Sequence, residues 1–222
     1  MSKKLVIVGT GETAVLAYEY FTHDSPYDVC GFAVEKAFLT GDSLCGLPVV
    51  AFEEMEKKYP PEEYDAFVAM SAGQLNRQRT HSYRETKAKG YKLASYVSSR
   101  AFVWHNVEIG DNCFIMENNT LQPFTKVGNN VVMWSGNHLG HRSVIKDNCF
   151  ISSHVVFCGF CEIGENTYIG VNSSVTDVKV AADNFIAMGT VIGKNTEENA
   201  IYKGNPAVKA PITAKKFCHV KE

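Results

Sequence analysis

The chain has 222 residues, 45% of them apolar and 21% charged, which is the balance of an ordinary globular protein with room for one or two domains. Its 22 basic and 24 acidic residues give a net charge of −2, so nothing in the composition indicates binding to a nucleic acid polymer or to an anionic membrane surface. No apolar run reaches the roughly 20 residues of a membrane span, so we expect no membrane insertion. Seven cysteines at scattered spacings favour a reduced, cytoplasmic protein.

The first 96 residues alternate predicted strands and helices. An apolar run at residues 5–8 predicts a buried strand, which a glycine turn joins to a helical pattern at residues 14–21. The same alternation continues with strands predicted at 27–34, 46–49, 66–70 and 91–96, and helices predicted at 52–59 and 75–89. It is typical of a small parallel sheet in an α/β domain.

The glycine turn consists of Gly9, Thr10 and Gly11. A strand, a glycine turn and a helix in succession can present backbone N–H groups and a helix dipole to a phosphate. The turn lacks the third glycine of the dinucleotide fingerprint, so a tight turn with a purely structural role stays open. Glu35 follows the second predicted strand, where small α/β domains often contact a ribose or a base.

From residue 97 onward a period of six replaces this alternation. A large apolar residue stands at every sixth position from Val97 to Val175, and the phase resumes at Val180 after one residue is lost. A helix repeats every 3.6 residues and a strand every 2, so neither explains the pattern. A fixed short repeat is typical of a parallel β-helix, whose apolar residues point into a narrow prism. We expect the repeats to occupy residues 97–194 and a C-terminal turn and tail to occupy residues 195–222.

Hexapeptide repeats followed by the turn Gly204-Asn205-Pro206-Ala207 resemble the left-handed β-helix acyltransferases. The glycine turn ahead of the repeats narrows the resemblance to the sugar acetyltransferases, which include the nucleotide-amino-sugar N-acetyltransferases of the bacillosamine pathway and the sialic acid O-acetyltransferase-like group. The resemblance implies a Rossmann-like domain at residues 1–96 that binds a nucleotide-linked sugar, and a left-handed β-helix that uses acetyl-CoA without a metal. It also implies a homotrimer with active sites between adjacent β-helices.

Acetyl transfer from a thioester needs a base for the attacking amine or hydroxyl and donors for the developing oxyanion. Histidine, with an ordinary pKa near 6.5, is the natural base. His141 lies two places after the inward Leu139, which puts it outward at a corner, and Gly159 follows one coil later. Strands stack about 4.8 Å apart, so a glycine there would leave His141 uncovered and offer a nearby N–H. His141 also occupies the place of the family's catalytic histidine, so we expect it to be the general base for direct transfer.

Two residues depart from the family pattern. Arg142 stands where many relatives carry an acidic residue that orients the histidine, and Phe150 stands where a second histidine is common. The orienting group is therefore expected to be a backbone carbonyl or a carboxylate of a neighbouring subunit, with Glu117 as a candidate.

The resemblance also assigns the binding residues. The acceptor's diphosphate is expected at Gly9, Thr10 and Gly11, and its uridine or ribose near Glu35. Substrate contacts are expected from Asn137 and His138. The coenzyme is expected along the later coils, at Gly159, Val171 and Gly189, with Lys203 or Asn205 at its nucleotide end.

Three other functions remain open from the sequence. The transfer could be to a sugar hydroxyl instead of an amine. A zinc-dependent β-helix of the γ-carbonic anhydrase type would need histidines from more than one subunit, because His105 and His141 lie two coils, about 10 Å, apart. A non-catalytic binding subunit would have had no reason to retain His141 and Gly159.

Overall fold

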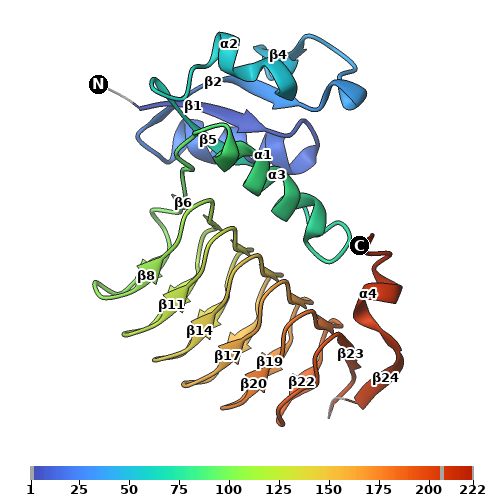
Figure 1. Cartoon of the computed structure of the whole chain (residues 1–222). Helices are drawn as coiled ribbons and strands as arrows, with labels where there is room; N and C mark the ends of the chain where they lie inside the picture. Colours follow the sequence, from blue (N-terminus) through green and yellow to red (C-terminus); the bar gives the residue numbers. More distant parts are fainter. Residues whose placement is uncertain (1–2, 206–207, 222) are drawn as a thin grey trace. The chain divides into compact units, whose positions relative to one another are not determined.

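The computed structural model describes residues 3–205 and 208–221 (Figure 1). The chain forms two compact units. The first contains the chain up to residue 71 together with residues 79–96, and the second contains residues 72–78 and everything from residue 97 onward. The end of the Gly204-Asn205-Pro206-Ala207 turn, residues 206–207, lies outside the described residues. No helix of the described residues is long and apolar enough to cross a membrane.

The first unit is an α/β sheet with strand order β3–β4–β2–β1–β5. β1 pairs in parallel with β2 and β5, β4 pairs in parallel with β2, and β3 is antiparallel to β4. The aromatic rings of Phe21, Phe32 and Phe67 are fully or almost fully buried in its core. The elements are β1 (Lys3–Val8), α1 (Glu12–His23), β2 (Tyr27–Val34), η1 (Lys36–Phe38), β3 (Ser43–Leu44), β4 (Leu47–Ala51), η2 (Phe52–Glu54), α2 (Met55–Lys58), β5 (Tyr64–Val68) and α3 (Arg77–Ala88).

Two expected elements of this region differ in the structure. The strand expected at residues 91–96 is wrong, because only Leu93 forms a bridge, to Ala66, before the chain continues into β6 (Tyr96–Val97). The run is apolar because Tyr91, Leu93 and Ala94 are buried, not because they extend the sheet. The helix expected from residue 75 begins at Arg77, because the preceding residues have positive φ, which an α-helix excludes.

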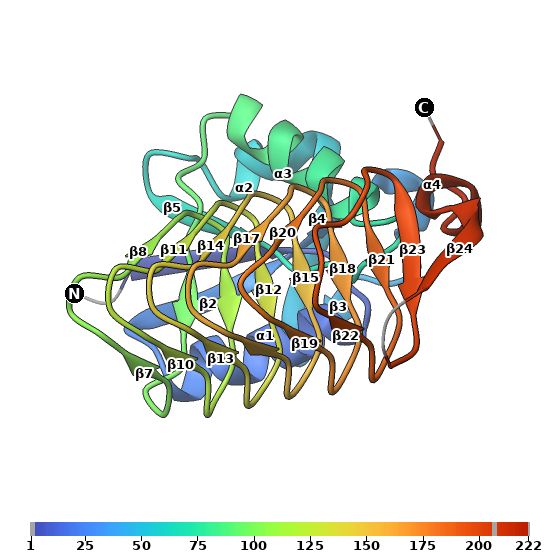
Figure 2. The same cartoon turned by 90° about the horizontal axis from the view of Figure 1, so that it is seen from below.

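The second unit is a parallel β-helix, as the period of six predicts, and it is left-handed, as the family resemblance implies. Each strand from β6 to β22 is two residues long and ends on an apolar residue of the repeat, and those apolar residues from Ile115 to Val175 are buried in one continuous core. Figure 2 shows the successive coils stacked side by side from β7 to β22. The lost residue after Val175 shortens one turn, and the core continues through Val180, Ile186 and Ile192.

The strands form three sides of a prism, and the chain passes from side 1 to side 2 to side 3 in each coil. Side 1 contains β6, β9 (Phe114–Ile115), β12 (Val132–Met133), β15 (Phe150–Ile151), β18 (Tyr168–Ile169), β21 (Phe185–Ile186), β23 (Ala200–Lys203) and β24 (Val208–Thr213). Side 2 contains β7 (Phe102–Val103), β10 (Thr120–Leu121), β13 (His138–Leu139), β16 (Val156–Phe157), β19 (Ser174–Val175) and β22 (Val191–Ile192). Side 3 contains β8 (Glu108–Ile109), β11 (Lys126–Val127), β14 (Val144–Ile145), β17 (Glu162–Ile163) and β20 (Lys179–Val180).

Left-handed backbone closes the corners between these sides. Asn112, Asn130 and Asn148 have φ values of 52°, 56° and 63° at successive coils of the corner between sides 3 and 1. Asparagine tolerates this conformation better than most residues. Their side-chain amides form a buried ladder, in which Asn112 donates to Asn130 and Asn130 to Asn148, each over 2.9 Å.

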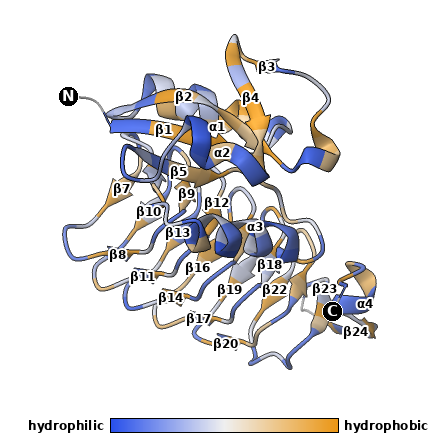
Figure 3. Cartoon of the chain, turned by 45° about the horizontal axis from the view of Figure 1, so that its top comes forward, coloured by the Kyte–Doolittle hydropathy of each residue, from blue (hydrophilic) through white to orange (hydrophobic). Residues whose placement is uncertain are grey.

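The outward faces of the three sides differ in polarity, and hydrophobic and hydrophilic segments alternate along the coils (Figure 3). Side 3 is charged: Lys126 pairs with Glu108, and Lys146 and Lys179 both pair with Glu162. Side 1 carries a stack of aromatic rings, Phe150 on Tyr168 and Tyr168 on Phe185, with centroids 5.5 and 4.8 Å apart. The C-terminal α4 (Ala214–Phe217) adds Phe217 to the end of this stack.

Residues 72–78 pack against side 1 as part of the second unit. Leu75 is buried there with Ile201, Ala210 and Ala214. The buried side-chain amide of Asn76 donates to the carbonyl oxygen of Asn166 over 3.0 Å, and Arg77 forms a 2.6 Å ion pair with Asp183. Gln74, Leu75 and Asn76 all have positive φ, between 51° and 67°. Because each left-handed residue is unfavourable, these buried contacts must hold the segment in place.

Candidate active site

His141 lies at the corner between sides 2 and 3, directly after β13, and its side chain is exposed. Its backbone N–H donates to the side-chain oxygen of Gln122 over 2.9 Å, and its carbonyl accepts from the backbone N–H of Phe160 over 3.0 Å. These two bonds tie the histidine to the coils before and after it. Among the described residues, the imidazole nitrogens have no hydrogen-bond partner. The ring is therefore held at its base and open at its tip.

The imidazole lies over Gly159 of the next coil. A Cβ at position 159 would clash with the ring, because it would lie 2.6 Å from Nε2 and 2.9 Å from Nδ1, closer than van der Waals contact allows. The glycine is therefore required by the position of the ring, as the sequence interpretation anticipated. The ring also meets the edge of Phe160, with centroids 5.1 Å apart.

The corner around His141 is unusual in its residues. Phe124, Arg142 and Phe160 occupy equivalent places in three successive coils, with φ values of 66°, 59° and 61°. Bulky residues with positive φ are outliers, whereas most other left-handed residues in the coils are Asn, Asp or Gly. Both phenylalanines are more than half exposed, and the Arg142 guanidinium lies 4.7 Å from the Phe124 ring centre. Strained, exposed aromatic residues are typical of functional surfaces rather than of simple corners.

The two other expected substrate contacts on the coils lie in different environments. His138 is on β13 and points outward on side 2, between Thr120 and Val156 of the neighbouring strands. Asn137 is 1% exposed: its amide donates to the carbonyl of Trp134, and its oxygen accepts from the backbone N–H of Val155. Asn137 therefore closes the interior of a corner, and its side chain is not placed to touch a ligand at the surface.

The expected coenzyme residues lie at two different corners of one chain. Gly159 shares the side 2–side 3 corner with His141, whereas Val171 and Gly189 lie at the side 1–side 2 corner, joined by a 2.8 Å backbone hydrogen bond. Lys203, at the end of β23, and Asn205, in the following turn, are both exposed. A ligand that touches both corners must therefore lie along side 2 or between two copies of the chain.

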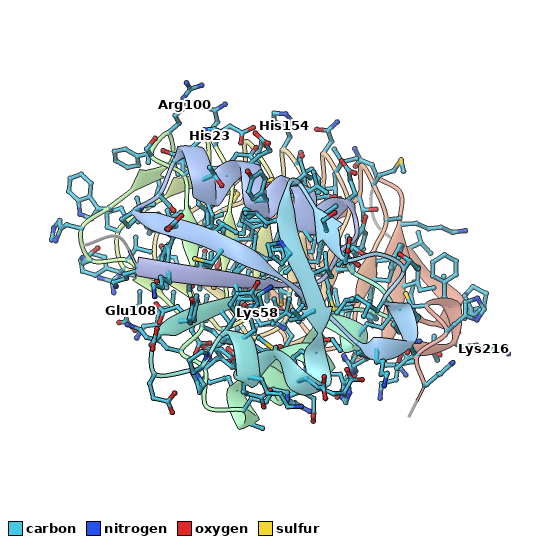
Figure 4. All side chains as sticks on the ribbon, turned by 90° about the horizontal axis from the view of Figure 1, so that it is seen from above. His23, Lys58, Arg100, Glu108, His154 and Lys216 are labelled. Carbon is cyan, nitrogen blue, oxygen red and sulfur yellow. The ribbon has the colours of Figure 1, made fainter. Side chains whose placement is uncertain are left out.

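Glu117, the expected orienting carboxylate, also lies at the side 1–side 2 corner. Its Oε1 accepts a 2.6 Å hydrogen bond from the Ser135 hydroxyl. His154 is exposed at this corner, where its side chain points away from the ribbon (Figure 4), and its ring lies against Gly136. Within one chain, neither residue is at the corner that carries His141.

In the first unit, the two glycines of the turn after β1 have different environments. Gly9 has φ +127°, and a Cβ there would lie 2.6 Å from the carbonyl oxygen of Ala69, so the fold requires glycine. Gly11 has φ −81°, and a Cβ there would meet no atom within 4 Å. Neither backbone nor packing requires glycine at position 11. Open space before a helix N-terminus is what an approaching phosphate needs.

A cavity of about 410 Å³ lies at the carboxyl ends of β1 and β2, the usual place for a ligand in an open parallel sheet. Gly9 lines it, and its apolar residues are Val8, Val34, Phe38, Phe52 and Met70. Its polar residues are Glu35 and Glu53 on one wall, and on the other wall His81, Ser82 and Glu85 of α3 with Lys89 directly after the helix. Of the residues singled out in the sequence, Gly9 and Glu35 are therefore brought to one cavity.

Phe38 and Ser82 were missed by the sequence analysis. Phe38 lines this cavity and a second one that Thr10 also lines, and it is 64% exposed. A large apolar residue in a polar loop directly after a strand was the available signal. Ser82 had no such signal, because its location depends on which face of α3 packs on the sheet.

Residues 106–141 and 142–177 match the family model described as bacterial transferase hexapeptide (six repeats). A variant of perosamine N-acetyltransferase from Caulobacter crescentus, solved with CoA and GDP-perosamine, superimposes with a TM-score of 0.83 at 20% identity, over 96% of this chain and 99% of that one. The acetyltransferase domain of PglB from Neisseria gonorrhoeae gives a TM-score of 0.84 at 23% identity, over 94% and 100%.

These matches confirm the expected fold, an α/β unit followed by a β-helix of hexapeptide repeats. The PglB domain has also been solved with acetyl coenzyme A, at a TM-score of 0.84 and 22% identity to this chain, over 95% of this chain and 100% of that one. No curated protein matches this sequence. Within the described residues of one chain, no three His, Cys, Asp or Glu side chains are grouped so that they could hold a metal ion.

Proposed function

We propose that the protein is an acetyl-CoA-dependent N-acetyltransferase that acts on the amino group of a nucleotide-linked amino sugar. The observation that carries this proposal is the pairing of His141 with Gly159. An exposed imidazole is tied at its backbone, rests on a glycine that leaves it room, and has no partner at its nitrogens among the described residues. This arrangement suits a residue that must take a proton from a substrate.

The proposed reaction is direct transfer. The neutral amine nitrogen of the acceptor attacks the carbonyl carbon of the thioester and forms the N–C bond. His141 takes a proton from that nitrogen as the tetrahedral intermediate forms. The C–S bond then breaks, and the imidazolium returns the proton to the leaving sulfur, so that CoA and the acetamido sugar are the products. The backbone N–H of Gly159 is the candidate donor to the oxyanion.

The first unit provides a place for the nucleotide of the acceptor. The open side of Gly11, at the N-terminus of α1, would receive the diphosphate, together with the Thr10 backbone. Gly9 would shape the turn, because its N–H already donates to the Ala33 carbonyl over 2.8 Å. The neighbouring cavity at Glu35 would receive the nucleoside. The Caulobacter crescentus relative, which was solved with GDP-perosamine, supports a nucleotide-linked amino sugar as the class of acceptor. His138, on the outward face of side 2, remains the proposed contact to the sugar.

For the donor, we place acetyl-CoA along the later coils. Its pantetheine would pass the backbones of Gly159, Val171 and Gly189, with Lys203 or Asn205 at the nucleotide end. Because these residues lie at two corners, a second copy of the chain is the simplest way to bring both to one coenzyme.

We therefore propose a homotrimer, and exposed apolar residues on side 2 and its corner with side 3 support it. Such a surface is unfavourable in water and marks an interaction site. The residues are Phe102, Trp104, Phe124, Val156 and Phe160, each at least 41% exposed in the single chain. The shared site would supply the group that orients His141, for which Glu117 of a neighbouring copy is the candidate. Sedimentation as a monomer of 24.6 kDa would contradict this assembly.

A reduced, cytoplasmic location completes the proposal. All seven cysteines are free thiols in the structure, and free thiols are typical of proteins in reducing compartments.

The experiment that tests the function is a CoA-release assay with acetyl-CoA and a panel of nucleotide-linked sugars. The panel pairs each amino sugar with the same sugar carrying a hydroxyl at that carbon. Release with the amino sugar, and an acetamido product by mass spectrometry, is the expected result. Release with the hydroxyl sugar alone would instead identify an O-acetyltransferase. The absence of release with every member, from a protein that binds both ligands, would indicate a non-catalytic subunit.

A further inference from the structure

The cavity of the first unit has a pronounced negative charge. Glu35, Glu53 and Glu85 line it, against one lysine and one histidine. Lys89 is already paired with Glu56, over 2.7 Å, and its ammonium lies 4.9 Å from the Phe52 ring centre. The cavity therefore repels phosphate and attracts groups that donate hydrogen bonds. We therefore expect the cavity to hold the nucleoside, and the diphosphate to lie outside it, at the open side of Gly11.

One wall of the cavity presents a polar side chain that nothing in the described chain satisfies. Ser82 is 8% exposed and lines the cavity, and its hydroxyl has no hydrogen-bond partner in the described structure. A hydroxyl that lines a cavity without a protein partner is available to hydrogen-bond a ligand atom. Glu85 is three residues later on α3 and so lies on the same face of the helix.

The three carboxylates differ in what they already bind. Both oxygens of Glu53 accept from the backbone N–H of Lys36, at 3.2 and 3.0 Å. Glu35 directly follows β2, the place from which an acidic residue usually meets a ribose. Glu85 has no partner among the described residues. Glu85 and Ser82 are therefore the pair left to contact a base.

We propose that Ser82 and Glu85 select the base of the acceptor's nucleotide, and that this base is guanine. The inference rests on the proposed function and names the nucleotide that the proposed function leaves open. The Watson–Crick edge of guanine has an acceptor, O6, beside two adjacent donors, N1–H and the N2 amino group. Ser82 donates to O6, and the Glu85 carboxylate accepts from both donors. Phe38, at the rim, stacks on the base.

The same pair disfavours uracil and thymine. Uracil and thymine have one donor, N3–H, between two carbonyl oxygens, so a carboxylate that reaches N3–H also meets an acceptor. An unpaired or repelled polar group in a cavity weakens binding strongly. The preference for guanine over uracil and thymine thus rests on the order acceptor–donor–donor of the guanine edge, with Ser82 as the donor and Glu85 as the acceptor of the cavity wall.

The test is isothermal titration calorimetry on the full chain with GDP, IDP, UDP and dTDP. IDP is guanine without its 2-amino group. We expect GDP to bind most tightly, IDP about tenfold more weakly because one charge-assisted hydrogen bond is lost, and UDP and dTDP more weakly still. Glu85→Gln is expected to remove most of the difference between GDP and IDP. Glu62→Gln, at the opposite edge of the sheet, is the matched control and should leave it unchanged.

The outcomes separate this inference from the proposed function. Binding of UDP or dTDP as tight as that of GDP overturns the selection of guanine and leaves a nucleotide-sugar acetyltransferase intact. A Glu85→Gln variant that folds, by its thermal transition, yet keeps the full GDP preference overturns the role of Glu85. Failure of all four nucleotides to bind overturns both the inference and the proposed acceptor site.

Discussion

The imidazole of His141 fills the space in which a side chain at position 159 would lie, so these two residues are interlocked across adjacent coils. The period of eighteen that relates neighbouring coils puts position 159 beside the histidine, and the missing Cβ of Gly159 gives the ring its place. This relationship makes the function of His141 testable without changing the histidine itself.

Gly159→Ala is expected to displace the ring while sparing the fold. The new methyl group would overlap an exposed side chain, which can rotate away at little cost. We expect kcat to fall about tenfold or more, because a misplaced catalytic group loses much of its effect, with the thermal transition little changed. Gly193→Ala is the control, since a Cβ there would come no nearer than 3.9 Å to its neighbours. If steady-state kinetics give equal kcat values for Gly159→Ala and Gly193→Ala, the missing Cβ of Gly159 has no role in catalysis.

Gly11→Val tests the phosphate site. Position 11 is open and has an ordinary backbone, so the variant is expected to fold normally. A valine side chain would occupy the space proposed for the diphosphate, so the KM for the nucleotide sugar should rise about tenfold or more while that for acetyl-CoA stays the same. Initial-rate kinetics with each substrate varied in turn measure both. Unchanged constants for both substrates would mean that the open space has no role in binding.

Asn76→Ala should destabilise the protein by about 2 kcal/mol, for two reasons. The variant leaves the Asn166 carbonyl without its buried hydrogen-bond donor, and it puts alanine, which tolerates positive φ less well than asparagine, in a left-handed conformation. Asn172→Ala is the matched control, since Asn172 is also left-handed, with φ 58°, but exposed. Urea unfolding of both variants measures the difference. Equal losses would show that the buried amide contributes nothing beyond its backbone conformation.

The two cysteines of the Cys158-x-x-Cys161 pair should react very differently. Cys158 is exposed, whereas Cys161 lies in the core of the prism, where burial raises the pKa of its thiol. Thiolate is the reactive form, so iodoacetamide at pH 8 should modify Cys158 in the native protein and reach Cys161 only after unfolding. Peptide mass spectrometry distinguishes the two. Equal modification in the native state would place both thiols outside the core.

Much of the fold could be predicted because stacking makes the repeat regular. Each apolar residue from Val97 to Val175 has to point inward if the coils are to close, so periodicity alone predicted the strands and the core. Residues 72–78 could not be predicted in this way. The left-handed turn at Gln74, Leu75 and Asn76 has no glycine to signal it. It is held by the hydrogen bond of Asn76 to Asn166 and by the ion pair of Arg77 with Asp183, which join residues 90 and 106 positions apart.

The candidate site was predicted in part. The place of His141 over Gly159 follows from counting eighteen residues, and the structure has it. Asn137 was expected to contact substrate together with His138, but its position four places after Met133 is an interior one, where the amide replaces a small residue. Val171 follows Gly159 by twelve residues, which is two sides of the prism, so the two residues lie at different corners of one chain. The family resemblance assigned both to the coenzyme without showing this separation.

The central claim, that His141 is the general base of an acetyltransferase, is tested most directly by the kcat of His141→Asn and His141→Ala. General-base catalysis is worth on the order of 10²–10⁴-fold, so kcat should fall by about that factor with both KM values little changed. His23→Ala, at an exposed histidine in the last turn of α1, is the control and should retain full activity. A His141→Ala variant that keeps more than about a tenth of the wild-type kcat would contradict the claim.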